Sequence, residues 1–444
     1  MIRVYISLIV IGIANRQLTA QTSDSTKHKT KTEKIKTGWN FGVLPAIAFD
    51  SDLGFQYGAL ANFYHYGDGS VYPMYKHSLY FEWSRTTKGS GTNQFTYDSK
   101  YLIPHVRVTA DFRYLTEKAL DFFGFNGNIA TYQPMLEDVG SASYISKMFY
   151  RQERKQGRIK LDFQGNVLKN NNYVKWHAGY IYFNNHISTV DINNLNKGKS
   201  GSDILPDTAL LYDKYIDWQI IPQDEKNGGV NNMLEAGIIY DTRDNEPNPM
   251  KGMWSEALLI SSPGFLGNKF TFNRISITHR QYFTIRREVL NFAYRVSYQG
   301  KLSGHEPFYL LPFQFYSKEI REGLGGAKTI RGMLRNRFVG ENTIFANFEL
   351  RWKFFRTIKF NQNFYSALTL FTDIGKVTGA YSTTSNPEAL TYIKNASTDM
   401  WHNTFGAGLY FAMNQNFVAA FNYGVATDKN EGKNALYIGL NFLY

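Results

Sequence analysis

The sequence contains no cysteine, few prolines and no long apolar run beyond its first twenty residues. The absence of cysteine excludes a disulfide-stabilised scaffold, a thiolate zinc site and a cysteine nucleophile. Twelve prolines in 444 residues exclude a collagen-like or proline-rich disordered chain. No run after residue 20 approaches the roughly 18 apolar residues of a membrane helix, so a helical membrane protein is excluded as well.

Aromatic residues make up 16% of the sequence, although its mean hydropathy is only −0.37. The 37 glycines and 31 tyrosines are spread almost evenly, and no linker divides the chain. This combination is typical of strands with one apolar and one polar face. The net charge of +12 is distributed over the chain with no basic helix, so we do not expect nucleic-acid binding.

The first twenty residues have the pattern of a signal peptide. Arg3 gives a short basic start, Val4–Ala14 is apolar, and Leu18–Ala20 resembles a cleavage site. The residues that follow are polar and rich in lysine and threonine, which is typical of a mobile tail. We therefore expect residues 1–20 to be a signal peptide and residues 21–38 a flexible periplasmic tail. The alternative is a short buried N-terminal segment.

The remaining residues, 39–444, consist of short segments in which apolar and polar residues alternate. The clearest is Ile344–Phe354, where large apolar residues alternate with asparagine, glutamate, arginine and lysine. A period of two places the two sets on opposite faces of a strand. We identify sixteen such segments, which begin near Trp39, Leu53, Tyr75, Thr92, His105, Gly157, Asn172, Asn232, Met253, Phe270, Glu288, Ile344, Phe364, Thr404, Phe417 and Asn434.

The gaps between these segments alternate in length. Short gaps follow even-numbered segments, and they include Pro104, Lys169–Asn171, Thr284–Arg287 and Asn414–Asn416. The long gaps follow odd-numbered segments, and they are Leu115–Gln156, His186–Asn231, Lys301–Thr343 and Ile374–Asn403. A transmembrane barrel has tight periplasmic turns and long external loops, and its closure satisfies the backbone in lipid. We therefore predict an all-β fold, a 16-stranded antiparallel transmembrane β-barrel, with a large soluble all-β protein as the alternative.

The last strand is expected to run to the final residue of the sequence. Tyr437, Gly439, Phe442 and Tyr444 form a pattern that resembles the C-terminal assembly signal of outer-membrane barrels. Aromatic residues near strand ends are expected to form the girdles at the two membrane interfaces, and these are Tyr282, Phe283, Trp352, Phe354, Phe355, Phe442 and Tyr444.

Three motifs lie within this framework. The eleventh gap contains Gly323–Met333 (GLGGAKTIRGM), Phe371–Gly375 (FTDIG) comes two segments later, and Asp241–Asn245 (DTRDN) precedes two prolines and a glycine. Together they resemble the Omp85 (bacterial surface antigen) superfamily of outer-membrane barrels, over about residues 39–444. In that family a Val/Ile-Arg-Gly motif lies on the external loop between strands eleven and twelve. A Phe-x-Asp-x-Gly motif lies on strand thirteen.

The resemblance implies that the tip of the loop between strands eleven and twelve is held inside the barrel. Arg331 lies thirteen residues before Ile344, and thirteen extended residues reach about 43 Å, more than the ~25 Å apolar belt. The alternation points Glu349 and Asp373 into the lumen, so we expect Arg331 to pair with one or both carboxylates. Gly323, Gly325, Gly326 and Gly332 would allow tight turns with positive φ and a close approach to the wall. The lumen-loop motif and its wall partners are Gly325, Gly326, Ile330, Arg331, Gly332, Glu349, Phe371, Asp373 and Gly375. The alternative is an exposed loop with a solvated arginine.

Two features lie near strand ends. The carboxylates of Asp241–Asn245 could suggest calcium, but metal loops usually present more oxygens and the following prolines favour a turn. We interpret this segment as the periplasmic turn before the ninth strand. Pro45 in the first strand lacks a ladder donor, and it lies where the first and last strands meet. A weakly paired seam is therefore a hypothesis.

The resemblance implies a protein that aids protein translocation or membrane insertion, with no enzymatic activity, no metal and no cofactor. Relatives with that role usually carry periplasmic POTRA domains, and residues 22–37 are too short for one, so we expect a periplasmic or lipoprotein partner. The alternative is a structural or pore-forming barrel that scaffolds a lipoprotein or surface complex. A hydrolase is disfavoured because no local Ser/His/acid set is present. Other expected partners are the lipid and lipopolysaccharide of the Gram-negative outer membrane and the barrel-assembly machinery for insertion of the chain itself.

Overall fold

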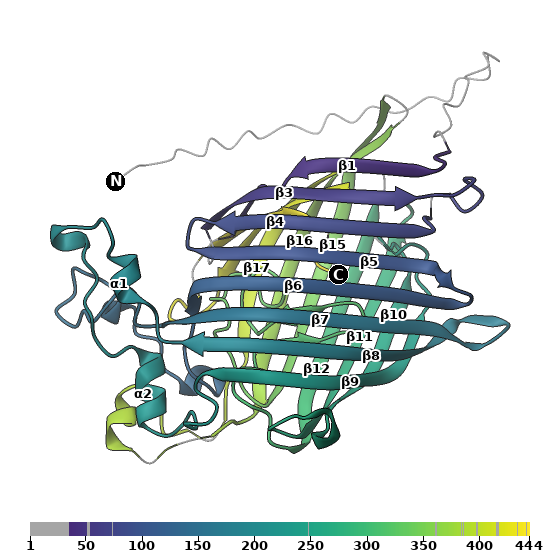
Figure 1. Ribbon diagram of the computed structural model, residues 1–444. Coiled ribbons are helices and arrows are strands. Elements are labelled where there is room, and N and C mark those ends of the chain that lie inside the picture. Colours follow the sequence, from purple (N-terminus) through teal and green to yellow (C-terminus); the bar gives the residue numbers. More distant parts are fainter. Residues whose placement is uncertain are drawn as a thin grey trace, which may run out of the picture.

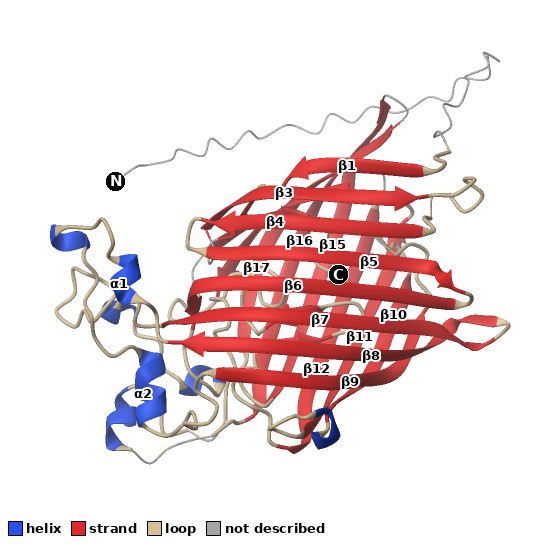
Figure 2. Cartoon of the chain, in the orientation of Figure 1, coloured by secondary structure: helices blue, strands red, loops and turns tan. Residues whose placement is uncertain are grey.

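Long antiparallel strands form most of the regular secondary structure, and long loops gather at one end of them, as Figures 1 and 2 show. The computed structural model describes residues 35–50, 54–72, 74–246, 248–359, 362–382, 384, 386–396, 398–413, 417–432, 434–440 and 442–444. The expected signal peptide and most of the expected tail lie outside the described residues.

Each strand pairs with its sequence neighbour, and the sheet closes on itself. The wall strands are β1 (Trp39–Pro45), β2 (Ala48–Asp50), β3 (Gly54–His65), β4 (His77–Thr86), β5 (Ser90–Ile103), β6 (Val106–Asp121), β7 (Arg151–Leu168), β8 (Asn171–Ser188), β9 (Gly228–Asp241), β10 (Gly252–Ser262), β11 (Phe272–Arg286), β12 (Leu290–Gly304), β15 (Asn342–Lys359), β16 (Gln362–Gly379), β17 (His402–Met413), β18 (Phe417–Ala426) and β19 (Ala435–Leu440). Since β1 and β2 are two parts of one strand, both pairing with β3, the prediction of a closed 16-stranded barrel is confirmed.

Helices are short and lie in the loops. They are α1 (Ile192–Leu195) and α2 (Leu211–Asp217), with single 3₁₀ turns at Gly127–Ile129, Pro134–Leu136, Gly201–Asp203, Gly264–Leu266 and Pro387–Thr391. None of the helices in the described ranges is long and apolar enough to cross a membrane.

The two faces of each strand differ as the alternation predicts. On β15, the side chains of Asn347, Glu349 and Arg351 are buried, whereas Leu350 and Trp352 are 37% and 48% exposed. The buried set is polar and faces the lumen, and the exposed set is apolar and faces outward. This arrangement is opposite to that of a soluble protein and suits a barrel surrounded by lipid.

Several strands extend farther toward the long-loop end than the sequence predicts. Strand β7 begins at Arg151 rather than near Gly157, and β6 ends at Asp121 rather than before Leu115. The added part of β7, Arg151–Gln156, is polar on both faces. Because both of its faces are polar, the alternation that marks the other strands is missing there.

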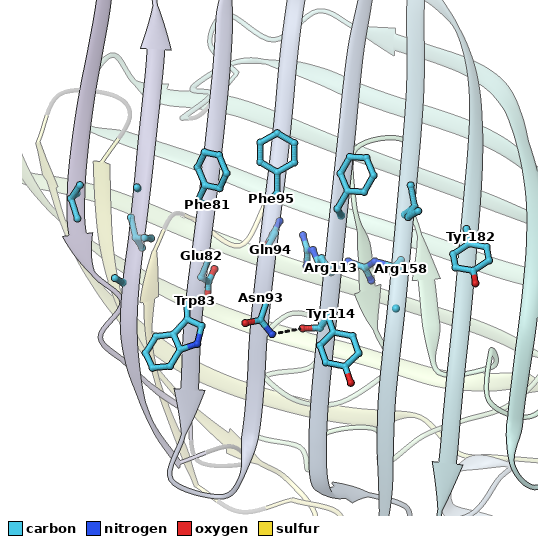
Figure 3. Close-up of a pocket in the computed structure, with 17 residues that line it drawn as sticks. Phe81, Glu82, Trp83, Asn93, Gln94, Phe95, Arg113, Tyr114, Arg158 and Tyr182 are labelled. Carbon is cyan, nitrogen blue, oxygen red and sulfur yellow. Dashed lines mark hydrogen bonds between the residues drawn. The ribbon is translucent and has the colours of Figure 1, made fainter.

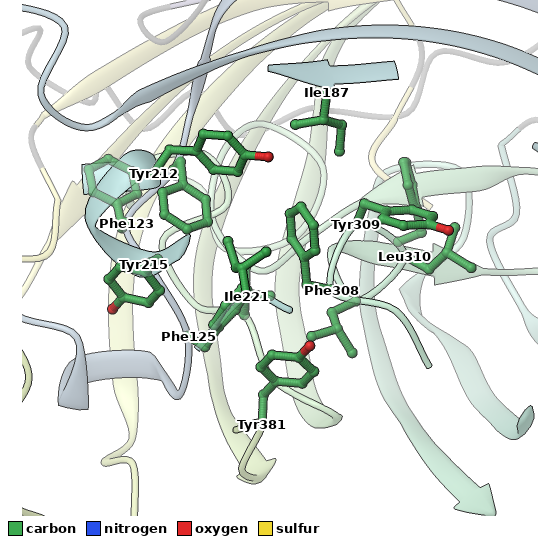
Figure 4. Packing of buried hydrophobic residues seen from close by; sticks show 14 of the residues in the cluster. Phe123, Phe125, Ile187, Tyr212, Tyr215, Ile221, Phe308, Tyr309, Leu310 and Tyr381 are labelled. Carbon is green, nitrogen blue, oxygen red and sulfur yellow. The ribbon is translucent and has the colours of Figure 1, made fainter. Parts of the chain in front are cut away.

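The long loops pack together at one end of the barrel. Residues 122–150, 189–227 and 380–401 contribute aromatic side chains to a common buried cluster, which we call the cap. Figure 4 shows Tyr215 against Phe125, and their ring centroids are 5.7 Å apart. Tyr381 and Phe308 approach the same phenylalanine ring from two other loops. The cap therefore ties the long loops to one another.

The seam between the first and last strands is the weakest junction in the described wall. Strand β19 pairs with β2 through two residue pairs, Phe49–Ile438 and Asp50–Tyr437, whereas β15 and β16 share seventeen. Strand β1 pairs along its length with β3, and no pairing between β1 and β19 occurs among the described residues. Pro45 ends β1 at the point where the strand is interrupted.

The end of the chain departs from the sequence prediction. Strand β19 ends at Leu440, and Phe442 and Tyr444 are buried rather than part of an outer aromatic girdle. The hydroxyl of Tyr444 donates to the backbone carbonyls of Ala293 and Asn347. Tyr282 is buried as well, since it lies on the lumen face of β11. The other expected girdle residues are exposed, and these are Phe283, Trp352, Phe354 and Phe355.

Candidate functional site

A shallow hollow in the outer wall is not the place where polar groups converge. It has a volume of about 720 Å³, and most of its lining consists of outward-facing side chains of β3 to β8. Figure 3 shows Phe81, Trp83 and Tyr114 among them, and all three are more than 40% exposed. Such a surface suits contact with lipid. The polar residues gather instead on the opposite side of the wall, in the lumen.

The lumen is crossed by the long connection between β12 and β15, residues 305–341, which we call the plug loop. It contains a small hairpin of β13 (Phe313–Phe315) and β14 (Ile320–Glu322). Ile330 and Arg331 are 0% and 1% exposed and lie against the inner face of β15 and β16.

Arg331 is clasped by two carboxylates from the wall. Its Nε and Nη2 donate to the two oxygens of Asp373, both at 2.8 Å, and its backbone N–H donates to the same carboxylate at 3.0 Å. Its Nη1 forms an ion pair with Glu349 at 2.8 Å. Burial alone would lower the pKa of Arg331, but the two carboxylates raise it above its ordinary value. The arginine is therefore held as a cation in a buried, charge-balanced site.

The remaining motif residues form the surroundings of this clasp. The ring of Phe371 lies under the guanidinium of Arg331, 3.5 Å from centroid to carbon, which is a cation–π contact. Gly375 leaves room for Ile330, because a Cβ at this glycine would come within 2.7 Å of the Ile330 side chain. Asn347 donates to Asp373 at 2.7 Å and so fixes the orientation of that carboxylate.

Glycines allow the loop to approach the wall. Gly332 has a φ of +99°, and a Cβ there would lie 2.9 Å from the backbone of Gly424 on β18. Gly325 and Gly326 also have positive φ, whereas Gly323, which was expected to share this property, does not. The backbone N–H of Gly332 donates to the hydroxyl of Tyr437 at 3.2 Å, which connects the motif to β19.

A second arginine extends the clasp toward the end of the chain. Arg351 pairs with Glu349 at 2.6 Å and donates to the backbone oxygen of Tyr444 at 3.1 Å. Arg295, on β12, donates to the amide oxygen of Asn347 and lies 5.0 Å from the centroid of the Tyr444 ring. These cations explain why the last aromatic residue turns into the lumen.

The plug loop also binds the opposite wall. Glu322 and Arg335 of the loop meet Glu117 on β6 and Arg154 on β7, and all four side chains form one network of ion pairs. Nε of Arg154 donates a hydrogen bond to the carboxylate of Glu117 at 2.8 Å. Since β6 and β7 are on the other side of the barrel from β15 and β16, these contacts anchor the loop across the full width of the lumen.

The turn between β9 and β10 lies at the end of the barrel with the short turns, where it contacts the plug loop. Residues 242–251, between β9 and β10, place Glu246 in ion pairs with Arg107 of β6 and with Lys318 of the plug loop. Asn248 donates to the hydroxyl of Tyr365 on β16 at 2.8 Å. The turn thus contacts strands on both sides of the lumen.

The carboxylates of this turn act as acceptors for protein groups. Asp241 accepts a hydrogen bond from Nε of Arg243 at 2.9 Å, and Asp244 accepts one from the backbone N–H of Met250 at 3.0 Å. The preferred interpretation of Asp241–Asn245 as a turn agrees with these contacts.

Several residues of these ion-pair networks were not predicted from the sequence. Arg295 and Arg351 have inward parity, which could have marked them as partners of the clasp. No sequence signal pairs Glu117 and Arg154 with Glu322 and Arg335, because that contact depends on the path of a long loop.

Reversing the charges of the clasp tests its contribution to stability. Arg331→Glu places three carboxylates together, so we expect the free energy of unfolding to fall by about 3–5 kcal/mol. Adding Asp373→Arg should recover part of this loss. Urea unfolding of the full barrel, followed by heat-modifiable electrophoretic mobility, measures both. Arg356→Glu is the matched control, because Arg356 forms an exposed pair with Glu288 that contributes about 1 kcal/mol or less. Equal losses in the single and double variants would contradict the pairing.

Acid should weaken the anchor on the opposite wall. Burial raises the pKa of Glu322, but Arg154 and Arg335 lower it further, to about 2 from an ordinary 4.5. Since the folded pKa is the lower one, Glu322 stabilises the fold above pH 4.5, and this contribution disappears as the pH falls toward 2. The stability difference between the wild type and Glu322→Gln should therefore be full at pH 7 and vanish near pH 2. A difference that does not change with pH would contradict this account.

Comparison with known proteins gives the family. The Omp85 superfamily domain matches residues 83–442. Among solved structures, the chain is similar to BamA from Haemophilus ducreyi lacking POTRA domains 1–3, with a TM-score of 0.54 and 14% identity over 91% of this chain and 70% of that one. It is also similar to CdiB from Escherichia coli, with a TM-score of 0.53 and 11% identity over 90% of this chain and 63% of that one. No curated protein matches the sequence.

At these identities the two structures show a common fold, and the family follows from the domain match, which covers most of the chain. The fold and the family together indicate an outer-membrane protein. The chain therefore belongs to the Omp85 superfamily.

Proposed function

We propose that this barrel aids the translocation of a protein across the outer membrane, or its insertion into that membrane, together with a periplasmic or lipoprotein partner. Members of the Omp85 family are transporters or insertases rather than enzymes, which supports this class of function. The single observation that carries the proposal is the short pairing between β2 and β19.

The seam leaves backbone groups available to another chain. Among the described residues, two residue pairs join β2 to β19, and each net hydrogen bond contributes only about 0.5–1.5 kcal/mol. The side of β1 that faces away from β3 has no partner strand within the described residues, and its Trp39, Phe41 and Val43 are each more than half exposed. An unpaired strand edge is a template for an incoming strand, and an apolar surface suits one that enters lipid.

The plug loop supports a route along the wall rather than through the lumen. Its anchors on two opposite sides of the barrel, at Asp373 and at Glu117, hold the loop across the path that a diffusing substrate would take. Its contact with Tyr437 also reaches the strand that forms the seam.

The second candidate is a structural barrel that scaffolds a lipoprotein or surface complex. The cap favours it, because three long loops and the plug loop share one aromatic core and so form a rigid external surface. A scaffold needs no movement at the seam, whereas a translocator or insertase does.

A disulfide across the seam separates the two candidates. The chain has no cysteine, so Phe49→Cys with Ile438→Cys introduces one defined pair at directly opposed positions. Under oxidation we expect the locked barrel to lose its cellular function, with outer-membrane and surface proteins depleted as in a deletion strain. Reduction should restore them. Quantitative mass spectrometry of the outer-membrane fraction measures the effect.

Phe405→Cys with Val425→Cys is the matched control, because these residues are directly opposed on β17 and β18, away from the seam. It should form a disulfide without loss of function. A locked seam that leaves the surface proteome unchanged, in a strain where deletion changes it, would contradict the proposal and favour the scaffold.

A further inference from the structure

We propose that Asp162, His177 and Glu235 bind a zinc ion on the inner wall of the barrel. The three side chains come from the adjacent strands β7, β8 and β9, and each is no more than 3% exposed. Their ligand atoms all lie within 4.8 Å of one another. This inference does not depend on the proposed function.

The unpaired ring nitrogens of His177 indicate a ligand at this place. Neither of its ring nitrogens has a hydrogen bond, although the ring is buried. A buried polar group without a partner costs about 1–3 kcal/mol, so it calls for an explanation such as a bound ion. Its Nε2 faces the two carboxylates, 3.6 Å from an oxygen of Asp162 and 3.5 Å from an oxygen of Glu235.

These separations suit tetrahedral zinc. Zinc binds histidine nitrogen and carboxylate oxygen at about 2.0–2.2 Å, which places neighbouring ligand atoms about 3.3–3.6 Å apart. One nitrogen and two oxygens leave the fourth position for water. The softer or larger alternatives fit less well, because calcium prefers oxygen ligands alone and the chain offers no thiolate.

The backbone makes room for the site. Gly179 lies between Asp162 and Glu235 in the register of the three strands. A Cβ at this position would come within 2.8 Å of the Asp162 oxygen and 3.4 Å of the Glu235 side chain. The glycine therefore allows the two carboxylates to converge on one point.

Lys160 holds the carboxylates when the metal is absent. Its ammonium lies 2.5 Å from Asp162 and 2.7 Å from Glu235, at the same two oxygens that face His177. One ammonium balances only one of the two carboxylates, so the buried group keeps a net negative charge that attracts a cation. Lys160 also donates to the backbone carbonyl of Ser317 in the plug loop at 3.4 Å, so it has a partner outside the two carboxylates.

The test measures bound zinc on the full chain, produced without a histidine tag and refolded in detergent with zinc chloride. After desalting, mass spectrometry should find about one zinc per folded barrel, as in a single tetrahedral site. X-ray absorption should show one imidazole and otherwise oxygen ligands. His177→Ala and Asp162→Asn should lose the metal. Lys160→Met should keep it and bind it more tightly, because the competing cation is gone.

His279→Ala is the matched control and should keep the full zinc content. His279 lies on β11, away from the proposed site, and its ring nitrogens contact Ser255 of β10 and Tyr294 of β12. Folding of each variant is checked by heat-modifiable mobility, and Lys160→Met keeps the test valid if a ligand variant fails to fold. Equal zinc in the wild type, His177→Ala and Asp162→Asn would show an adventitious ion only and overturn the proposal. Absence of zinc from both the wild type and Lys160→Met would overturn it as well.

Discussion

The buried ion pair between Arg331 and the wall is the interaction on which the arrangement of the lumen depends. A guanidinium at 1% exposure would be very unfavourable without compensation, and Asp373 and Glu349 supply two negative charges at 2.8 Å. The contact joins a loop to strands β15 and β16 and fixes where that loop lies. Phe371, Gly375 and Asn347 are then explained by this one cation, because they cover it, make room beside it or orient its partner.

The plug loop is held by many contacts, whereas the wall has one weakly paired junction. The loop is anchored at both sides of the lumen, through Asp373 and through the network of Glu117 and Glu322, and a turn with Glu246 holds it from below. The wall, in contrast, is closed at the seam by two residue pairs in the part of the chain that the structure describes. Through Gly332 the plug loop contacts β18 and β19 beside that seam. A movement of the loop would therefore change the contacts of the strands that close the barrel.

The sequence predicted the fold well where lipid and lumen act on opposite faces of a strand. Alternation located all sixteen strands, and parity placed Glu349 and Asp373 where Arg331 meets them. It failed where that contrast is missing: Arg151–Gln156 is polar on both faces, and its strand was therefore predicted too short. Tyr444 was placed on the outer surface because parity says nothing about a strand that ends early, and the arginines that draw it inward come from distant strands.

Electrical conductance of the purified barrel in planar bilayers shows whether the plug loop obstructs the lumen, because a loop anchored across the barrel lowers the steady ion current. We expect a low conductance for the wild type and a markedly higher one for a folded Arg331→Ala variant, in which the loop has lost its ion pairs with Asp373 and Glu349. Steady wild-type conductance at the level of an empty 16-stranded pore, unchanged by the substitution, would show that Arg331 does not hold the loop across the lumen.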